Sequence, residues 1–281
     1  MAQTLAGHAL LLLAAGVLAL ALAGGAVAAL VAIATRYRDQ LWALVDLVVP
    51  GERLRPWTYL ALHLALGLIV VAAGAAFVVI AENVVAGREI AAFDLEFARA
   101  LADETTPAWQ SVFRVITFLG NGAVIFGIAS LVGVVLARRR ETLLLIMWIV
   151  SQSGSGLLNY ALKALFGRAR PDGADPLLHG GGSSFPSGHA MNTLVLCGIA
   201  AYLLLRLRPW RGAVALQIAL LLAWGMAVGF SRLYLGVHFV SDVIAGFLAG
   251  AAWIAVCVSG AEVAARVRRP PPGGPAASRE S

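Results

Sequence analysis

Residues 57–82 read WTYLALHLALGLIVVAAGAAFVVIAE, and this stretch decides the class of fold. It contains one formally charged residue, Glu82, at its end. A helix rises about 1.5 Å per residue, so about 20 apolar residues cross the roughly 30 Å hydrocarbon core of a bilayer. Six further segments have the same character, at 6–34, 113–137, 141–165, 188–207, 211–231 and 237–260. The sequence therefore predicts an all-α protein, a polytopic transmembrane helical bundle.

The composition agrees with a membrane protein and argues against a soluble or nucleic-acid-binding one. Of the 281 residues, 60% are hydrophobic and 13% are charged, whereas a soluble domain has about 25% charged residues. The net charge of +6 does not indicate nucleic-acid binding, because the basic residues lie in short loops between apolar segments. Cys197 and Cys257 both lie in apolar segments without neighbouring metal ligands, which indicates buried thiols rather than a disulfide or a metal site.

Positive charges lie in alternate loops, and this pattern predicts the orientation of the chain. Cytoplasmic loops of membrane proteins are enriched in lysine and arginine. If successive segments alternate in direction, the arginine-rich loops share one face, which is then cytoplasmic. The amino terminus is expected outside and the carboxyl terminus inside. The arginines concerned are Arg36, Arg38, Arg53, Arg55, Arg138, Arg139, Arg140, Arg206, Arg208, Arg211, Arg266, Arg268 and Arg269.

The opposite, outer face receives the connections 83–112, 166–187 and 232–236. The first of these is acidic, and its apolar residues are spaced loosely, like one face of an amphipathic helix. Two interpretations stay open for it. It is either a helix that lies flat in the outer membrane interface or a solvated loop with one short helix.

The two ends of the chain have different characters. We expect residues 6–34 to form a transmembrane helix rather than a signal peptide. No basic residue precedes this segment, it is long, and Arg36 and Arg38 follow it. The carboxyl-terminal residues 261–281 are expected to be a disordered tail, because they are rich in proline and polar residues towards their end.

Three short motifs place ionisable residues at the predicted outer ends of four helices. Ionisable residues at such depth are costly in a bilayer, so they are candidates for a functional site. Each motif alone also has a plain structural explanation: a histidine–aspartate pair that caps a helix, cations that anchor headgroups, or a serine N-cap. The motifs are Lys163 with Arg170 and Pro171, then Pro186, Ser187, Gly188 and His189, and finally Ser231 and Arg232 with His238 and Asp242.

Together the motif residues fit the requirements of phosphoryl transfer. His238 and Asp242 share one helix face, so the carboxylate can fix one imidazole tautomer and leave the other nitrogen free to attack. His189 follows Ser187 and Gly188 at a helix start, where backbone N–H groups can bind an anion and the imidazole can protonate a leaving oxygen. The cations that can hold the phosphoryl oxygens are Lys163, Arg170 and Arg232.

These motifs resemble the three-part signature of the type 2 phosphatidic acid phosphatase (PAP2) superfamily, K-x6-RP, PSGH and SR-x5-H-x3-D, and every signature position is met. The resemblance covers about residues 57–260 and implies a six-helix core, to which segment 6–34 adds one extra amino-terminal transmembrane helix. The expected organisation is an amino-terminal helix and connector at 1–56, a phosphatase domain at 57–260 and a cytoplasmic tail at 261–281.

The resemblance implies a metal-independent phosphatase without a cofactor. It implies that His238 attacks phosphorus and forms a phosphohistidine, that Asp242 orients His238, and that His189 protonates the leaving group and then helps to activate water. From the residues alone either histidine is open as the nucleophile, although Asp242 at helical spacing favours His238. The residues that the resemblance implies as phosphate ligands are Lys163, Arg170, Ser187, Gly188 and Arg232.

The resemblance also implies a class of substrate and a location. Bacterial members of the superfamily hydrolyse phosphatidate, phosphatidylglycerol phosphate or undecaprenyl pyrophosphate. We therefore expect a lipid phosphate substrate, no nucleic-acid partner, and a site on the periplasmic side of a bacterial inner membrane. The sequence has no readable pattern that selects one lipid or one oligomeric state. Two alternatives stay open: a lipid phosphotransferase that uses the same phosphohistidine, and a non-enzymatic lipid-headgroup binder or transporter.

Overall fold

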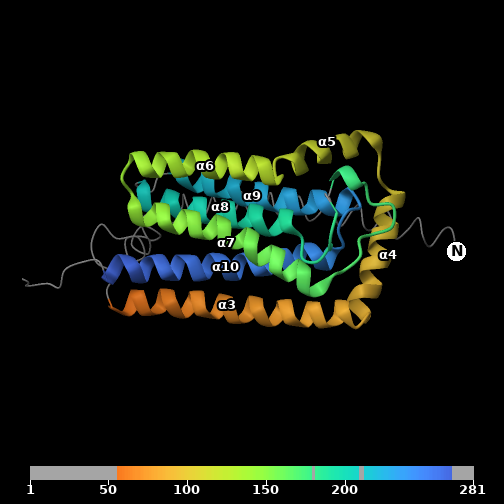
Figure 1. Ribbon diagram of the computed structural model, residues 1–281, viewed down its shortest axis with the longest axis horizontal. Coiled ribbons are helices and arrows are strands. Elements are labelled where there is room, and N and C mark those ends of the chain that lie inside the picture. The colour runs from red at the N-terminus through yellow and green to blue at the C-terminus, as the bar shows by residue number, and fades with distance from the viewer. Residues whose placement is uncertain (1–55, 179–180, 209–211, 268–281) are drawn as a thin grey trace, which may run out of the picture.

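A computed structural model describes residues 56–178, 181–208 and 212–267, and the regular structure of this part is entirely helical (Figure 1). No strand occurs among these residues. The short 3₁₀ helix η1, Pro176–Leu178, lies in the connection between α7 and α8. The α-helices are α3 Pro56–Val85, α4 Glu89–Asp103, α5 Pro107–Phe118, α6 Gly122–Arg138, α7 Thr142–Phe166, α8 Gly188–Leu207, α9 Gly212–Tyr234 and α10 Val240–Val267.

Within the described residues, six helical spans are long and apolar enough to cross a membrane. They lie side by side along the long axis of the molecule (Figure 1). Large apolar side chains point outwards from them, for example Leu68, Phe126 and Leu157, as expected for a surface that faces lipid. The predicted polytopic helical bundle is therefore confirmed. The spans are Thr58–Val85, Pro107–Arg138, Thr142–Phe166, Gly188–Leu207, Ala213–Tyr234 and Val240–Arg266.

The core of the bundle is built around tryptophans on α7 and α10. The Trp148 indole N–H donates to the Ala129 carbonyl at 2.8 Å, and the Trp253 indole N–H donates to the Ser151 carbonyl at 2.9 Å. Gly154 permits the second contact, because a Cβ atom there would lie 2.3 Å from the Trp253 ring. Gly156, two positions further along α7, makes no such contact, because a Cβ atom there would meet nothing within 4 Å.

The connection at 83–112 forms the short helix α4, followed by the start of α5. Helix α4 runs across one end of the bundle (Figure 1), so the connection contains the helix that both interpretations share. The span predicted at 113–137 is divided into α5 and α6. Thr106 caps α5 by accepting from Trp109 N, and Asn121 caps α6 by accepting from Ala123 N.

The predicted start of the disordered tail is too early. Helix α10 ends at Val267, beyond the boundary at residue 260. Glu262 explains the extension, because it is buried and accepts a hydrogen bond from the Tyr202 hydroxyl at 2.6 Å. Arg206 lies 3.6 Å from the same carboxylate. The predicted helix at 6–34, the arginines before residue 56 and the tail after residue 267 lie outside the described residues.

Candidate active site

The predicted site residues meet at the end of the bundle that α4 crosses (Figure 1). Lys163 lies in the last turn of α7, Ser187 is the N-cap of α8, Arg232 lies in the last turn of α9 and Asp242 lies in the first turn of α10. The Ser187 backbone N–H donates to the Asp242 carbonyl at 2.9 Å, which joins the starts of α8 and α10. Four helix ends from separate parts of the sequence thus converge, as the alternation of the segments predicted.

Aromatic packing fixes the connection that leads into α8. The buried Phe185 ring packs against Phe166, with ring centroids 5.0 Å apart, and against Phe77, with centroids 5.6 Å apart. The Ser184 backbone N–H donates to the Arg168 carbonyl at 2.8 Å, and the Ser184 hydroxyl donates to the Ala169 carbonyl at 2.9 Å. These contacts hold the start of α8 against the end of α7.

The His238 imidazole has a defined partner at each nitrogen. Its Nδ1 lies 3.3 Å from Asp242 Oδ2, and its Nε2 lies 3.2 Å from an amino group of Arg170. A guanidinium group only donates hydrogen bonds, so Nε2 must accept and the proton must reside on Nδ1, facing the carboxylate. The Phe239 backbone N–H also donates to Asp242 Oδ2, at 2.9 Å. The geometry therefore presents the lone pair of Nε2 to the site.

The surroundings of His238 favour its neutral form. Burial lowers the pKa of His238 to about 4, Arg232 and Arg170 act in the same direction, and Asp242 acts against it. A group whose pKa lies below the ambient pH is deprotonated, so His238 is neutral across the physiological range. A neutral imidazole retains the lone pair that a nucleophile requires.

We expect the ¹⁵N resonances of His238 in detergent-solubilised protein to keep the values of a neutral imidazole from pH 8 down to pH 5. The physical reason is the lowered pKa of His238, about 4, against 6.5 for a solvated imidazole. The measurement is a titration of protein with ¹⁵N-labelled histidine, with His238 assigned by its loss in a His238→Gln variant. A midpoint near 6.5 would contradict the expectation.

The three predicted phosphate-binding cations point into the same region and contact backbone carbonyls there. Lys163 Nζ donates to the Ser183 carbonyl, and Arg170 donates to the same carbonyl at 3.3 Å. The buried Arg232 donates to Thr117 Oγ1 at 2.6 Å and to the Leu178 carbonyl at 2.7 Å. The Nε atoms of Arg170 and Arg232 are buried without a partner in the described part of the chain. Donors therefore remain for an anion.

The start of α8 supplies further donors. The Ser187 hydroxyl is buried and has no hydrogen-bond partner among the described residues, and the Ser187 side chain makes no capping bond to α8. A side-chain N-cap is therefore not its role here, and both the hydroxyl and the first N–H groups of α8 can serve an anion. Gly188 leaves room for the Asn159 side chain, because a Cβ atom there would lie 2.7 Å from Asn159 Oδ1.

Helix α7 has a polar face that points inwards. Ser155 and Asn159 are both buried. The Ser155 hydroxyl donates to Asn192 Oδ1 at 2.6 Å, and the Asn159 amide donates to the Pro186 carbonyl at 3.4 Å. This face supports the turn that carries the start of α8.

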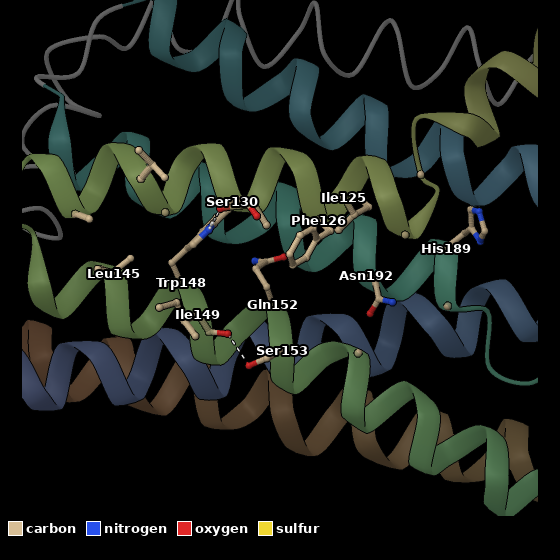
Figure 2. A pocket seen from close by; sticks show the side chains of 18 residues that line it. Ile125, Phe126, Ser130, Leu145, Trp148, Ile149, Gln152, Ser153, His189 and Asn192 are labelled. Carbon is tan, nitrogen blue, oxygen red and sulfur yellow. Dashed lines mark hydrogen bonds between the residues drawn. The ribbon is translucent and has the colours of Figure 1, made fainter.

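A groove of about 710 Å³ lies between α6, α7 and α8. His189 stands at one end of it, and the groove continues between α6 and α7 past Phe126 and Ile149 (Figure 2). The lining is mainly apolar, with Gln152 and Asn192 among its polar residues. A groove of this size and polarity is suited to an apolar chain whose polar end lies beside His189.

Three residues that contact the site were not predicted as part of it. Thr117 on α5 binds Arg232, and Asp94 on α4 is completely buried and binds Arg168 at 2.8 Å. Arg168, which lies within the first motif between Lys163 and Arg170, also binds Asp242 at 2.6 Å. Asp94 resembled its acidic neighbours in the sequence, and no local pattern marked it as buried.

Comparisons with known proteins point to one family. Residues 141–264 match the PAP2 superfamily. Phosphatidylglycerophosphatase B of Bacillus subtilis is 34% identical over 145 residues, which cover 51% of this chain and 71% of that protein. Lipid A 4'-phosphatase of Bacteroides thetaiotaomicron is 34% identical over 105 residues, which cover 34% of this chain and 43% of that protein.

A solved structure has a similar fold. The crystal structure of a transmembrane PAP2 type phosphatidylglycerolphosphate phosphatase from Bacillus subtilis aligns with a TM-score of 0.62 and 29% sequence identity. The alignment covers 69% of this chain and 96% of that one. The likeness therefore extends over nearly all of the solved chain.

Proposed function

The chain belongs to the PAP2 superfamily of membrane lipid phosphatases, and on this premise we propose that it releases phosphate from a membrane lipid through a phosphohistidine on His238. The observation that carries this proposal is the orientation of His238. Its Nδ1 faces Asp242 and its Nε2 accepts from Arg170, one of the cations of the site. The nucleophilic atom therefore lies where a phosphoryl group would be bound.

In the first step, the substrate phosphoryl group displaces the contact between Arg170 and Nε2 and takes over the arginine donors. Nε2 then forms a bond to phosphorus while the bond from phosphorus to the lipid oxygen breaks. His189 gives its proton to that leaving oxygen. The positive charge that develops on His238 is stabilised by Asp242, and the charge on the equatorial oxygens is stabilised by the cations.

In the second step, water attacks the phosphohistidine. His189, which lost its proton in the first step, now accepts one from the water molecule. The bond between Nε2 and phosphorus breaks, inorganic phosphate leaves, and His238 returns to its neutral form. The residues proposed to hold the phosphoryl oxygens in both steps are Lys163, Arg170, Ser187, Gly188 and Arg232.

The groove beside His189 supports a substrate with a long apolar chain. It begins at the histidine proposed to protonate the leaving group and runs between α6 and α7, both of which span the membrane (Figure 2). A lipid that approaches from the bilayer can place its phosphate at the helix ends while its chain stays in apolar surroundings. Phosphatidate, phosphatidylglycerol phosphate and undecaprenyl pyrophosphate all have this form.

The test of this function is a phosphate-release panel on purified protein in detergent, with these three lipids. We expect release from at least one of them, and undiminished release with a metal chelator. Folded protein that releases phosphate from none of them would overturn the proposal. Labelled phosphate that appears on an added lipid or sugar hydroxyl instead of in water would identify a phosphotransferase.

Filling the groove should weaken the binding of long-chain substrates selectively. Gly156 lines the groove and has open space around it, so Gly156→Leu would place a side chain where the lipid chain is proposed to lie. We expect KM for a long-chain lipid phosphate to rise about tenfold, equivalent to about 1.4 kcal/mol, with little change for a short-chain analogue. The measurement is steady-state phosphate release with both substrates.

A matched control is Gly67→Leu on α3, where a Cβ atom also meets nothing within 4 Å and which does not line the groove. The KM of this variant should equal that of the wild-type protein for both substrates. The placement of the lipid chain would be contradicted if Gly156→Leu and Gly67→Leu raised KM equally. It would also be contradicted if Gly156→Leu raised KM equally for the long-chain and short-chain substrates.

We also propose that the site faces the periplasm from a bacterial inner membrane, with the carboxyl terminus in the cytoplasm. Arg138 and Arg206 lie in the last turns of α6 and α8, helices whose first residues lie at the site end. Basic residues at the opposite end favour a cytoplasmic location for that end. The test uses an Arg139→Cys variant and a membrane-impermeant thiol reagent. Labelling that occurs only after cell lysis would support this orientation. Labelling of intact spheroplasts would indicate the opposite orientation.

A further inference from the structure

Arg168 lies between two buried carboxylates and links them. One of its terminal amino groups donates to Asp242 Oδ1 at 2.6 Å, and the other donates to Asp94 Oδ2 at 2.8 Å. Both carboxylate side chains are fully buried, whereas the Arg168 side chain is 12% exposed. A buried carboxylate without a partner is strongly unfavourable, so the single guanidinium group stabilises both.

Asp94 is anchored to the same turn that carries Asp242. The Ser241 backbone N–H donates to Asp94 Oδ1 at 3.0 Å, and the Ser241 hydroxyl donates to Asp94 Oδ2. Arg168 donates to the Ser241 hydroxyl at 2.8 Å, and its guanidinium carbon lies 4.3 Å from the centre of the Phe239 ring. Helix α4 and the start of α10 are therefore joined by a network of charged and neutral hydrogen bonds.

This network leaves Asp242 little freedom to rotate. Oδ1 is held by Arg168, while Oδ2 accepts from the Phe239 backbone and faces Nδ1 of His238. A rotation that broke the Arg168 contact would also turn Oδ2 away from His238. The orientation of the imidazole therefore depends on Arg168, and the orientation of Arg168 depends on Asp94.

We propose that Asp94 and Arg168 are positioning residues, which hold Asp242 in the orientation that keeps Nε2 of His238 directed at phosphorus. The inference rests on the proposed function of His238. It gives α4 a role in the reaction, although Asp94 lies outside residues 141–264, the part that matches the family. Arg168 contributes through Asp242 and does not hold the phosphoryl group, because both terminal amino groups are bound to carboxylates.

A positioning role and a phosphate-binding role predict different kinetics. Loss of a residue that orients a catalytic group lowers kcat and leaves KM nearly unchanged, whereas loss of a phosphate ligand raises KM as well. Two residues that act through one another also have non-additive effects. Arg168→Gln should therefore lower kcat only slightly in a protein that already carries Asp242→Asn.

The first arm of the test is kinetic and uses whichever lipid of the phosphate-release panel the wild-type protein hydrolyses. We expect Arg168→Gln to lower kcat about 10- to 100-fold, the range found when outer partners that orient metal-ligating histidines are removed, with KM within about twofold. Asp94→Asn should act in the same direction. In the Asp242→Asn background, Arg168→Gln should lower kcat less than about threefold further.

Other kinetic results would overturn the proposal. If Arg168→Gln raised KM, weakened inhibition by inorganic phosphate, and had the same fold-effects in the Asp242→Asn background, Arg168 would be a phosphate ligand. An unchanged kcat with a lower melting temperature would make the network a structural link only. Arg168→Lys retains the charge but not the two-pronged geometry of the guanidinium group. It therefore provides a second variant if Arg168→Gln does not fold. A wild-type kcat in Arg168→Lys would also overturn the proposal.

Arg114→Gln is the matched control, because the exposed Arg114 pairs with Asp175 at 3.3 Å and this pair is not part of the network of Arg168, Asp94 and Asp242. Its kcat should equal that of the wild-type protein. The second arm does not require activity: in ¹⁵N-histidine spectra, the Nδ1–H tautomer of His238 should be uniform in the wild-type protein and mixed in Arg168→Gln. A uniform tautomer in both would overturn the positioning role. Absence of phosphate release from the wild-type protein would instead overturn the proposed function.

Discussion

The His238→Gln variant is expected to lose phosphate release by a factor of about 10⁴ or more. Removal of a nucleophile eliminates the covalent route, and losses of this size follow when such a residue is removed from an enzyme. Glutamine is the suitable replacement because its amide retains polarity at a buried position. The measurement is phosphate release under single-turnover conditions, which separates the chemical step from substrate binding.

The control for this variant is His63→Gln on α3. His63 Nδ1 lies 2.8 Å from the Tyr59 carbonyl within its own helix, and the residue takes no part in the proposed site. Its activity should match that of the wild-type protein. Full activity of His238→Gln, with an unchanged melting temperature, would exclude His238 as the nucleophile.

The His189→Gln variant should lose activity in a way that depends on the leaving group. General acid catalysis contributes about 10²- to 10⁴-fold, and this contribution is needed only when the leaving oxygen is basic. We therefore expect a loss in that range for a lipid phosphate and a much smaller loss for the phosphate monoester of a 2-alkyl-4-nitrophenol of similar chain length. The measurement is kcat/KM for the two substrates.

Thr193→Val on the same helix is the control for His189→Gln. The Thr193 hydroxyl is buried without a hydrogen-bond partner in the described part of the chain, so its removal should leave activity unchanged. Equal losses for both leaving groups in His189→Gln would indicate that His189 positions the substrate and does not protonate the leaving oxygen.

The membrane-spanning architecture was predictable because hydropathy and length are local properties of the sequence. The segment at 188–207 coincides with α8, and the segment at 141–165 differs from α7 by one residue at each end. Alternation of the spans then placed Lys163 and Asp242 at the same end of the bundle. The convergence of the motifs follows from topology alone.

The parts of the site that were missed depend on contacts between distant residues. The hydrogen bond from Arg232 to Thr117 joins positions 115 apart in the sequence, and the pair of Arg168 and Asp94 joins positions 74 apart. No periodicity or composition marks such a contact. The break between α5 and α6 also coincides with a contact between distant residues. A Cβ atom at Gly120, which lies in this break, would be 2.3 Å from Val228 on α9.

The central claim is a covalent phosphoryl group on Nε2 of His238, and rapid-quench trapping tests it most directly. Wild-type protein is mixed briefly with a ³²P-labelled lipid phosphate that it hydrolyses, denatured under alkaline conditions, digested and mapped. The account predicts acid-labile, base-stable label on the peptide that contains His238, and none in His238→Gln. Label on His189, or repeated absence of label in protein that releases phosphate at full rate, would contradict it.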